Sequence, residues 1–202
     1  MNYENVYEEK KLLRSKMRKL LKERYSDLKN IQAAGNSAAQ KIILSEEFKN
    51  SDLIFSYIPY GFEIDPSFLV EIAWKNGKTV CVPRVVSDSN LMDFYFLDSK
   101  LSLQNQLESG AFGILEPKLT LRKVFTDSSL RDKKIFMVVP GLAFSKDGAR
   151  LGKGKGFYDL YLPRLLKTGC SLFTAGFAYC EQIVENIPVE KTDFFLDRIF
   201  TP

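Results

Sequence analysis

Histidine is absent from the 202 residues of this chain. Without an imidazole, no Ser-His-Asp or Cys-His arrangement can form, and a zinc site built from imidazole and thiolate ligands is excluded. Any chemistry must therefore use carboxylates, lysines, arginines, tyrosines or a hard metal ion. Cysteine is scarce as well. Cys81, Cys170 and Cys180 are odd in number and widely spread, which favours reduced thiols packed in the core over a disulfide framework.

Long apolar runs are also missing. No stretch approaches the roughly 20 apolar residues that a membrane-spanning helix needs, and the chain starts with charged and polar residues rather than a basic segment followed by a hydrophobic one. The sequence therefore predicts a cytoplasmic protein without a membrane partner. With 45% hydrophobic and 27% charged residues, the chain suits one well-buried core, and we expect a single domain over residues 1–202.

The net charge of +4 is concentrated at the start of the chain. Residues 1–30 hold nine Lys or Arg and five Asp or Glu, whereas the remainder holds twenty of each. From Val6 to about Leu28, apolar residues recur at helical spacing without Gly or Pro, which predicts one amphipathic helix. A nucleic-acid-binding arm is one interpretation of this basic helix, although acidic residues mixed with the basic ones favour a solvated face.

Two cations of this helix fall within its apolar sector. Lys10 and Arg14 are four positions apart, and at about 100° per residue both side chains project toward the body of the protein. Lys11, Lys19 and Lys22 fall on the solvated side instead. Inward cations are costly unless they are paired. They should therefore meet either carboxylates, in a buried ion pair, or a bound anion, and periodicity alone leaves both interpretations open.

Buried strand patterns alternate with helical patterns through the rest of the chain. Asp65 and Pro66 mark the start of one helix, with Asp65 as its cap, and Gly77 marks its stop. This order predicts an α/β fold, a three-layer α/β/α arrangement with a mostly parallel, open, Rossmann-like sheet. The other expected helices lie at 38–48 and 157–167, and the expected strands at 52–60, 79–86, 93–97 (an edge strand), 133–144 (a central strand) and 172–178.

The segment GARLGKGKGFYDLY (148–161) places glycines at every second position, after the expected central strand and before a helix. Missing side chains expose backbone N–H groups, and a helix start adds the positive end of its dipole. Together with Arg150, Lys153 and Lys155, these features indicate a phosphate-binding loop, with a flexible surface loop as the alternative. The spacing fits neither a Walker A loop, which needs GxxxxGK followed by Ser or Thr, nor the dinucleotide fingerprint GxGxxG.

Ordered landmarks run through the whole chain. The clearest is VVPGLAFSKDGARLGKGKGFYDLYL, where a strand ending in VPG precedes RLGxGxG, an aromatic residue, Tyr and Asp. The others are KxxxR at 10–14, Glu-Ile-Asp at 63–65, VPR at 82–84, MDF at 92–94, FGILEP at 112–117 and EQIVENIPVEKTDFFLDRIFT at 181–201. In this order the landmarks resemble those of the 5-formyltetrahydrofolate cyclo-ligase family, also called 5,10-methenyltetrahydrofolate synthetases.

The resemblance implies an α/β/α enzyme that uses ATP and Mg²⁺ to convert 5-formyltetrahydrofolate, with its polyglutamate preference left open, into 5,10-methenyltetrahydrofolate, ADP and phosphate. It implies catalytic roles for Arg150, Lys153 and Lys155, and magnesium ligation by Asp159 and Asp193. The implied ATP contacts are Lys10, Lys11, Arg14, Arg150, Gly152, Lys153, Gly154, Lys155, Gly156, Phe157 and Tyr158. The implied folate contacts are Tyr57, Ile58, Tyr60, Glu63, Lys153, Gly154, Lys155, Gly156 and Phe157.

Several of these residues also have a purely structural interpretation. A carboxylate such as Asp159 is favoured in the first turn of a helix by the helix dipole, and Asp193 could cap a turn. Glu63 could hydrogen-bond a pterin edge beside an aromatic cluster, or sit in a loop. Where the family often has His, this chain has Thr192.

The implied chemistry suits a protein without histidine. A formamide oxygen is a poor leaving group, so attack by N10 on the formyl carbon requires that this oxygen be phosphorylated first. Phosphoryl transfer mainly needs positioning and charge neutralisation, which lysines, arginines, backbone N–H groups and Mg²⁺ supply. The alternatives are a sugar-phosphate isomerase-like protein of similar architecture and a basic nucleic-acid-binding module. We expect no nucleic-acid partner, and a monomer or weak dimer.

Overall fold

The computed structural model describes residues 3–110 and 113–202. The helices are α1 (Tyr3–Arg24), α2 (Leu28–Ile43), α3 (Glu46–Lys49), α4 (Ser67–Lys75) and α5 (Phe157–Leu166), with short 3₁₀ turns at Gln104–Gln106, Ser128–Leu130 and Cys180–Gln182. The strands are β1 (Leu53–Phe55), β2 (Thr79–Val85), β3 (Met92–Phe96), β4 (Leu107–Ser109), β5 (Leu115–Pro117), β6 (Lys134–Val139), β7 (Ala143–Ser145), β8 (Arg150–Leu151), β9 (Ser171–Phe177), β10 (Ile183–Val184) and β11 (Arg198–Phe200).

The central sheet has six strands in the order β11-β9-β6-β1-β2-β3, and every neighbouring pair is parallel except β2 and β3. Leu53 of β1 pairs with Thr79 of β2 on one side and with Ile135 of β6 on the other. The chain runs from β1 outward to β2, and later from β6 outward to β9 on the opposite side. The order thus reverses between β1 and β6. In open α/β sheets, ligands bind at this switch point, beside the carboxyl ends of the strands.

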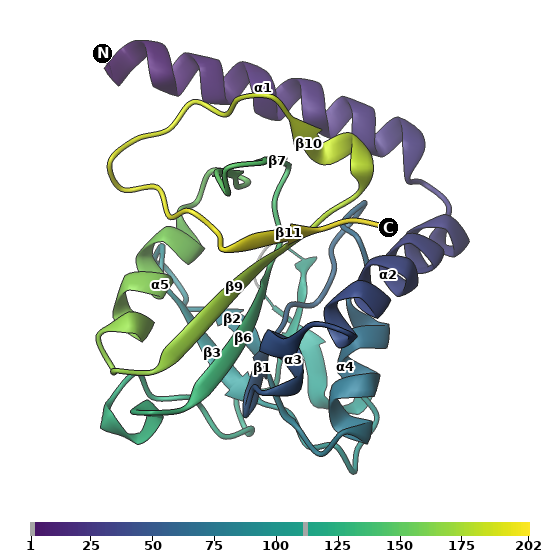
Figure 1. The fold of residues 1–202 in the computed structure, drawn as a ribbon, viewed down its shortest axis with the longest axis vertical. Helices are drawn as coiled ribbons and strands as arrows, with labels where there is room; N and C mark the ends of the chain where they lie inside the picture. Colours follow the sequence, from purple (N-terminus) through teal and green to yellow (C-terminus); the bar gives the residue numbers. More distant parts are fainter. Residues whose placement is uncertain (1–2, 111–112) are drawn as a thin grey trace.

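Helices cover both faces of the sheet, as Figure 1 shows, with α2 and α4 on one side and α5 on the other. Successive residues of a strand point to opposite faces. Ile54 and Phe136 accordingly pack in a buried cluster with α2 and α4, whereas Phe55 and Met137 pack in a second cluster with α5. The predicted three-layer α/β/α fold with a mostly parallel sheet is confirmed.

The first helix, α1, lies across the end of the sheet, over the segment that links β10 to β11 (Figure 1). Val6, Met17 and Leu21 are buried, so the predicted apolar face is confirmed over this part of the helix. The helix ends at Arg24, however. Leu28, predicted as the last residue of that face, is exposed because it starts α2 instead.

The second helix, predicted at 38–48, begins earlier, at Leu28. Asp27 caps it, since its carboxylate accepts a hydrogen bond from the N–H of Lys29 at 2.9 Å. Gly35 is helical although it weakens the sequence pattern, and a Cβ atom at this position would collide with the backbone oxygen of Asp65. Glycine therefore lets α2 approach the chain ahead of α4. The predicted end of this helix is a separate turn, α3, which Ser45 caps.

The apolar run 133–144, predicted as one central strand, forms two strands. β6 ends at Val139, because Pro140 has no N–H to donate to the sheet. The chain then turns, and β7 joins a three-stranded sheet with β8 and β10. The strand predicted at 52–60 is also shorter, since β1 ends at Phe55.

Other predicted boundaries agree more closely. Asp65 accepts a hydrogen bond from the N–H of Ser67 at 2.8 Å, but the prediction of Asp65 as the cap and Pro66 as the first helical residue is wrong by one position, since Pro66 is the N-cap and α4 starts at Ser67. Strand β3 is the predicted edge strand and runs antiparallel to β2. The short strands β4, β5, β8, β10 and β11 were not predicted, because two or three residues give no measurable periodicity.

The three cysteines are free, but only Cys81 is buried; Cys170 is half-buried and Cys180 is exposed. The prediction of three core thiols is therefore wrong for Cys180. Burial raises the pKa of the Cys81 thiol well above its ordinary value, which keeps it protonated and unreactive. Among the helices that the structure describes, none combines the length and the apolar content that a bilayer crossing requires.

The carboxyl end of α1 is fastened to the 3₁₀ turn that precedes β10. Arg24 pairs with Glu181 at 2.9 Å, and the hydroxyl of Tyr25 donates a hydrogen bond to the same carboxylate at 2.6 Å. The ring of Tyr25 also stacks on that of Tyr179, with 3.4 Å between the ring centroids. The hydrogen bond from Tyr25 lowers the pKa of the Glu181 carboxyl from its ordinary value of 4.5.

The variant Tyr25→Phe keeps the ring stack and removes this hydrogen bond. A carboxyl with a lowered pKa stabilises the folded state above its unfolded pKa, and this stabilisation is lost as the pH falls through the lowered value. We therefore expect the wild type to be more stable near neutral pH, by a difference in free energy of unfolding that shrinks below pH 4.5. Urea titrations at several pH values measure it, with Tyr7→Phe, at an exposed tyrosine, as the control. If the difference in free energy of unfolding persisted in acid, it would not come from the hydrogen bond between Tyr25 and the Glu181 carboxylate.

Candidate active site

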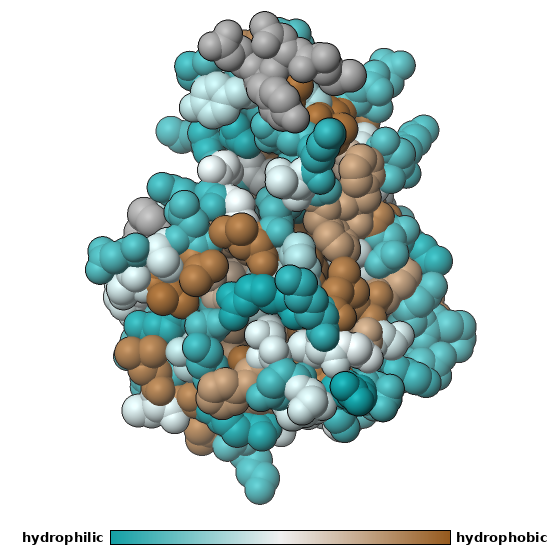
Figure 2. Space-filling model, turned by 90° about the vertical axis from the view of Figure 1, so that its left-hand side faces the viewer, coloured by the Kyte–Doolittle hydropathy of each residue, from teal (hydrophilic) through white to brown (hydrophobic). Residues whose placement is uncertain are grey.

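A cavity of about 960 Å³ lies at the switch point between β1 and β6. Its walls come from the segments that follow these strands (57–58 and 140–141), from the glycine loop (152–156) between β8 and α5, and from residues 190–194. On the face shown in Figure 2, hydrophilic and hydrophobic residues intermingle below the start of α1 instead of forming separate patches. A concave site with apolar walls and a few converging polar groups is the usual form of a ligand site.

The glycine loop forms one wall of this cavity, and all of its residues line it. Gly154 (φ +104°) and Gly156 (φ +71°) adopt left-handed backbone conformations that other residues rarely accept. Gly156 is also the N-cap residue of α5, directly before its first helical residue. A Cβ atom on Gly152 would lie 2.7 Å from Nη1 of Arg150, so a side chain there would push against this guanidinium. The predicted placement of the loop, after a strand and before a helix, is confirmed.

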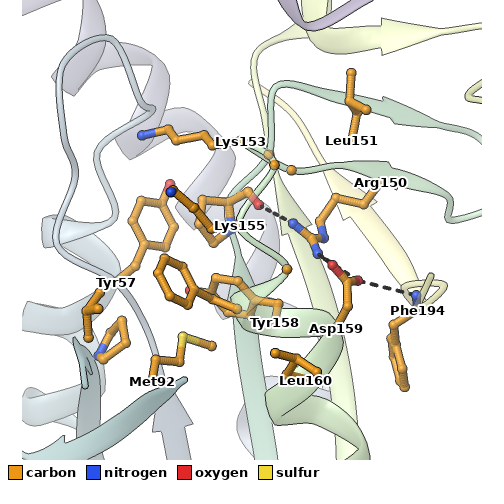
Figure 3. A pocket seen from close by; sticks show the side chains of 18 of the residues that line it. Tyr57, Met92, Arg150, Leu151, Lys153, Lys155, Tyr158, Asp159, Leu160 and Phe194 are labelled. Carbon is orange, nitrogen blue, oxygen red and sulfur yellow. Dashed lines mark hydrogen bonds and ion pairs between the residues drawn. The ribbon is translucent and has the colours of Figure 1, made fainter. Parts of the chain in front are cut away.

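Arg150 is held by contacts on several sides. Its Nη2 donates to both carboxylate oxygens of Asp159, at 3.0 and 3.2 Å, and Nη1 lies 3.5 Å from the backbone oxygen of Pro140. The guanidinium also lies 5.4 Å from the centroid of the Tyr158 ring. Asp159 in turn accepts from the N–H of Phe194 at 3.4 Å, as Figure 3 shows. Arg150 is thus a buried cation of fixed orientation at the cavity wall.

Lys153 extends from the glycine loop toward the opposite wall, on the side of Tyr57 (Figure 3). Its ammonium lies 2.7 Å from a carboxylate oxygen of Glu63 and 5.2 Å from the centroid of the Tyr60 ring. The other oxygen of Glu63 accepts from the N–H of Tyr60 at 2.9 Å. Glu63 is therefore held by two hydrogen-bond donors. The ion pair between Lys153 and Glu63 is a direct contact between a residue predicted to bind phosphate and one predicted to bind the folate.

Tyrosines and Ile58 form the more apolar part of the cavity. The hydroxyl of Tyr57 donates to the backbone oxygen of Ile64 at 2.6 Å. The hydroxyl of Tyr158 has no hydrogen-bond partner within the ranges that the structure describes. Burial, and next the negative charge of Glu63, raise the pKa of both hydroxyls above its ordinary value. Both tyrosines therefore stay neutral, as flat amphipathic surfaces.

The inward direction of Lys10 and Arg14 is confirmed, since both line the cavity. Lys10 is only 5% exposed, and its ammonium lies 2.8 Å from Glu190 and 2.6 Å from Asp193. Periodicity left open whether the inward cations meet carboxylates or a bound anion, and Lys10 meets carboxylates. Nε of Arg14 donates to the backbone oxygen of Gly152 at 3.1 Å. Glu190 was not predicted, because nothing in its local sequence signals a partner so distant along the chain.

Lys11, predicted as an ATP contact, is not brought to the cavity. It lies one residue, and therefore about 100°, around the helix from Lys10, where it is exposed and pairs with Glu8 at 3.2 Å. Phe157, Tyr60 and Thr192 do line the cavity, together with the remaining predicted loop residues.

The two predicted magnesium ligands also line the cavity, but each is engaged with a cation. Asp159 pairs with Arg150. Asp193 accepts from Lys10 and, at 2.7 Å, from the N–H of Glu190, so it caps a turn as well. Over residues 3–110 and 113–202, no three His, Cys, Asp or Glu side chains gather as a metal site.

A further wall was missed by the sequence-based assignment of site residues. Pro83, Val85 and Met92 from β2 and β3, with Leu115 and Glu116 from β5, line the side of the cavity that faces the glycine loop. Oε1 of Glu116 accepts from the N–H of Val85 at 3.0 Å, which ties β5 to β2. The landmarks VPR, MDF and FGILEP were the available signal, since they contain four of these five residues, all except Val85.

An open α/β sheet with a large cavity at the carboxyl ends of its parallel strands is the architecture of an α/β enzyme. The comparison with known families identifies which family of enzymes this is. The model described as "5-formyltetrahydrofolate cyclo-ligase family" matches residues 6–202, and the chain belongs to this family of ligases.

Individual relatives agree with this assignment. The mouse 5-formyltetrahydrofolate cyclo-ligase is 30% identical over 167 residues, which cover 79% of this chain and 78% of the mouse protein. The Escherichia coli K12 protein of the same name is 31% identical over 175 residues, covering 85% and 89%. The NMR structure of Aquifex aeolicus 5,10-methenyltetrahydrofolate synthetase superimposes with a TM-score of 0.68 at 29% identity, covering 93% of this chain and 89% of that one. The family predicted from the sequence is confirmed.

Proposed function

We propose that this protein uses ATP and Mg²⁺ to convert 5-formyltetrahydrofolate into 5,10-methenyltetrahydrofolate, with release of ADP and phosphate. One observation carries the proposal. A basic glycine loop and an aromatic surface meet in a single cavity of about 960 Å³, at the upper end of the usual size for ligand pockets. Such a cavity suits two ligands that must react with each other, a polyphosphate and a flat heterocycle.

The basic part of the cavity fits the phosphates of ATP. Arg150, Lys153 and Lys10 supply positive charge, and Gly152 and Gly154 bring bare backbone to the cavity surface. Cations and backbone N–H groups before a helix start are the donors that phosphate oxygens require. Because Lys10 already pairs with Glu190 and Asp193, a phosphate must compete with these carboxylates or bind beside them.

The aromatic part of the cavity fits the pterin ring of the folate. The rings of Tyr57, Tyr60 and Tyr158 offer flat faces, and Ile58 adds an apolar contact. Glu63 is anchored by Lys153 and by the N–H of Tyr60, so its carboxylate is fixed where it can accept hydrogen bonds from ring N–H groups. The same Lys153 extends from the loop that we assign to the phosphates, which brings the two ligands together.

The protein itself contributes position and charge rather than a covalent step. ATP, when bound, would supply the phosphoryl group that makes the formyl oxygen a leaving group. Arg150 and Lys153 neutralise negative charge around that oxygen, and the tyrosine walls exclude water from the reacting atoms. Asp159 and Asp193 suit a Mg²⁺ ion only if phosphate oxygens and water complete its coordination, which is how proteins commonly hold this ion.

The test follows the rise in absorbance of the methenyl product when purified protein is mixed with 5-formyltetrahydrofolate, ATP and Mg²⁺. We expect product only when all three are present, and none when ATP is omitted or EDTA is added. The rival functions are tested in parallel, by titrating the protein with a sugar phosphate and with RNA. A protein that leaves 5-formyltetrahydrofolate untouched under these conditions, but binds either rival ligand, contradicts the proposal.

A further inference from the structure

Two arginines of α1 hydrogen-bond to the backbone of the glycine loop. Nε of Arg14 donates to the backbone oxygen of Gly152, and Nη2 of Arg18 donates to the backbone oxygen of Lys153, each at 3.1 Å. The two arginines are four positions apart on the helix, so they lie on the same side of it. They bind consecutive carbonyl groups of the loop. Arg18 is exposed and is absent from the cavity lining, unlike Arg14.

The two hydrogen bonds also fix the direction of the N–H groups in the same two peptide units. In a planar trans peptide, the C=O of one residue and the N–H of the next point in opposite directions. The bond from Arg14 to Gly152 therefore turns the N–H of Lys153 away from α1. In the same way, the bond from Arg18 to Lys153 turns the N–H of Gly154 away from the helix. Both residues line the cavity.

These two N–H groups are available to a ligand. Among the described residues, neither the N–H of Lys153 nor that of Gly154 has a hydrogen-bond acceptor. Gly154 has a left-handed backbone (φ +104°), and left-handed residues are a component of the backbone turns whose successive N–H groups bind anions. The loop carbonyls at 152 and 153 have no other donor in the part of the chain that the structure describes. Their orientation therefore depends on the two arginines.

We propose that Arg18 is a positioning residue for phosphate binding, which acts through the carbonyl of Lys153 to present the N–H of Gly154 to the anion. The inference rests on the proposed function, since it takes the polyphosphate of ATP as the ligand of this loop. A cation bonded to the carbonyl also polarises the same peptide group, which makes its N–H a stronger donor. Arg18 thus affects the ligand without touching it.

The experiment compares Arg18→Met with Lys19→Met, which removes the same charge from the next, exposed position of α1. For Arg18→Met we expect the KM for ATP to rise about fivefold to tenfold, as for the loss of one charge-assisted hydrogen bond. The KM for 5-formyltetrahydrofolate and the melting temperature should stay near the wild-type values. Lys19→Met should match the wild type throughout, and Arg18→Lys should recover part of the loss, since it keeps one cationic donor.

Amide NMR spectra of the nucleotide-free protein separate positioning from direct contact. We expect the Gly154 resonance to shift in Arg18→Met and to stay in place in Lys19→Met. A wild-type KM for ATP in Arg18→Met would overturn the inference, and so would a raised KM with an unshifted Gly154 resonance, because Arg18 would then touch the nucleotide itself. If the wild type does not use ATP at all, the proposed function fails first, and this is evident before any variant is made.

Discussion

The variant Arg150→Met is expected to lose about a hundredfold or more in kcat/KM for the proposed ATP-dependent ring closure, since removing one fixed donor from a developing negative charge has an effect of this size. Arg150 is the best candidate for such a donor among the cations of the cavity. It is buried, and Asp159 and the ring of Tyr158 fix its guanidinium. Lys153, by contrast, has a side chain that is 38% exposed, so water screens part of its charge.

Three control measurements accompany this prediction. Lys146→Met removes an exposed cation from the same segment and should leave kcat/KM near the wild-type value. Arg150→Lys keeps the charge without the planar fork and should recover only part of the activity. Melting temperatures show whether the loss of activity comes from unfolding, because Asp159 loses its cationic partner in Arg150→Met. A well-folded Arg150→Met variant with nearly unchanged kcat/KM would remove Arg150 from the catalytic residues.

The variant Gly148→Ala is expected to be the most destabilising of the substitutions considered, by at least about 3 kcal/mol. Gly148 has a left-handed backbone (φ +93°), and a Cβ atom there would collide with the backbone oxygen of Leu196. The backbone oxygen of Gly148 also accepts a hydrogen bond from the N–H of Leu196 at 2.8 Å. The segments around Gly148 and Leu196 therefore cannot move apart to relieve the collision without losing this bond. Both the strain and the collision act on the turn that leads into Arg150.

Thermal unfolding measures this effect. For a chain of this size we expect the melting temperature to fall by about 6–12 °C, at about 2–4 °C per kcal/mol. The matched control is Gly77→Ala, at a glycine with φ +70° and no atom within 4 Å of the added Cβ. It tests the strain without the collision and should cost only about 1 kcal/mol. Equal losses in the two variants would show that the contact with Leu196 is unimportant.

Periodicity in the sequence was enough to find the layers of the fold and the direction of the basic side chains. The apolar stripe of α1 placed Lys10 and Arg14 toward the body of the protein, and both line the cavity. The failures have local causes. Gly35 weakens the pattern of α2, but close packing against Asp65 requires it. Pro140 divides an apolar run that otherwise reads as one strand.

Local sequence patterns could not predict which residues the inward cations of α1 contact. Lys10 meets Glu190 and Asp193, which lie at the far end of the chain, and no periodicity links residues at such a separation. The family landmarks supplied residue types that spacing alone could not, including Glu63 beside the aromatic cluster. They did not indicate that Arg18 reaches the glycine loop, because none of the landmarks includes this residue.

The contacts that hold α1 in place also set an order of events during folding. Apart from bonds within the helix, each side-chain hydrogen bond described for α1 and for the adjoining Tyr25 reaches a residue between 152 and 193. Residues 3–25 must therefore wait for residues 152–193 to fold before this helix can dock. Contacts between residues so far apart in the sequence form late and slowly, so the cavity takes its final form only when α1 docks against residues 152–193.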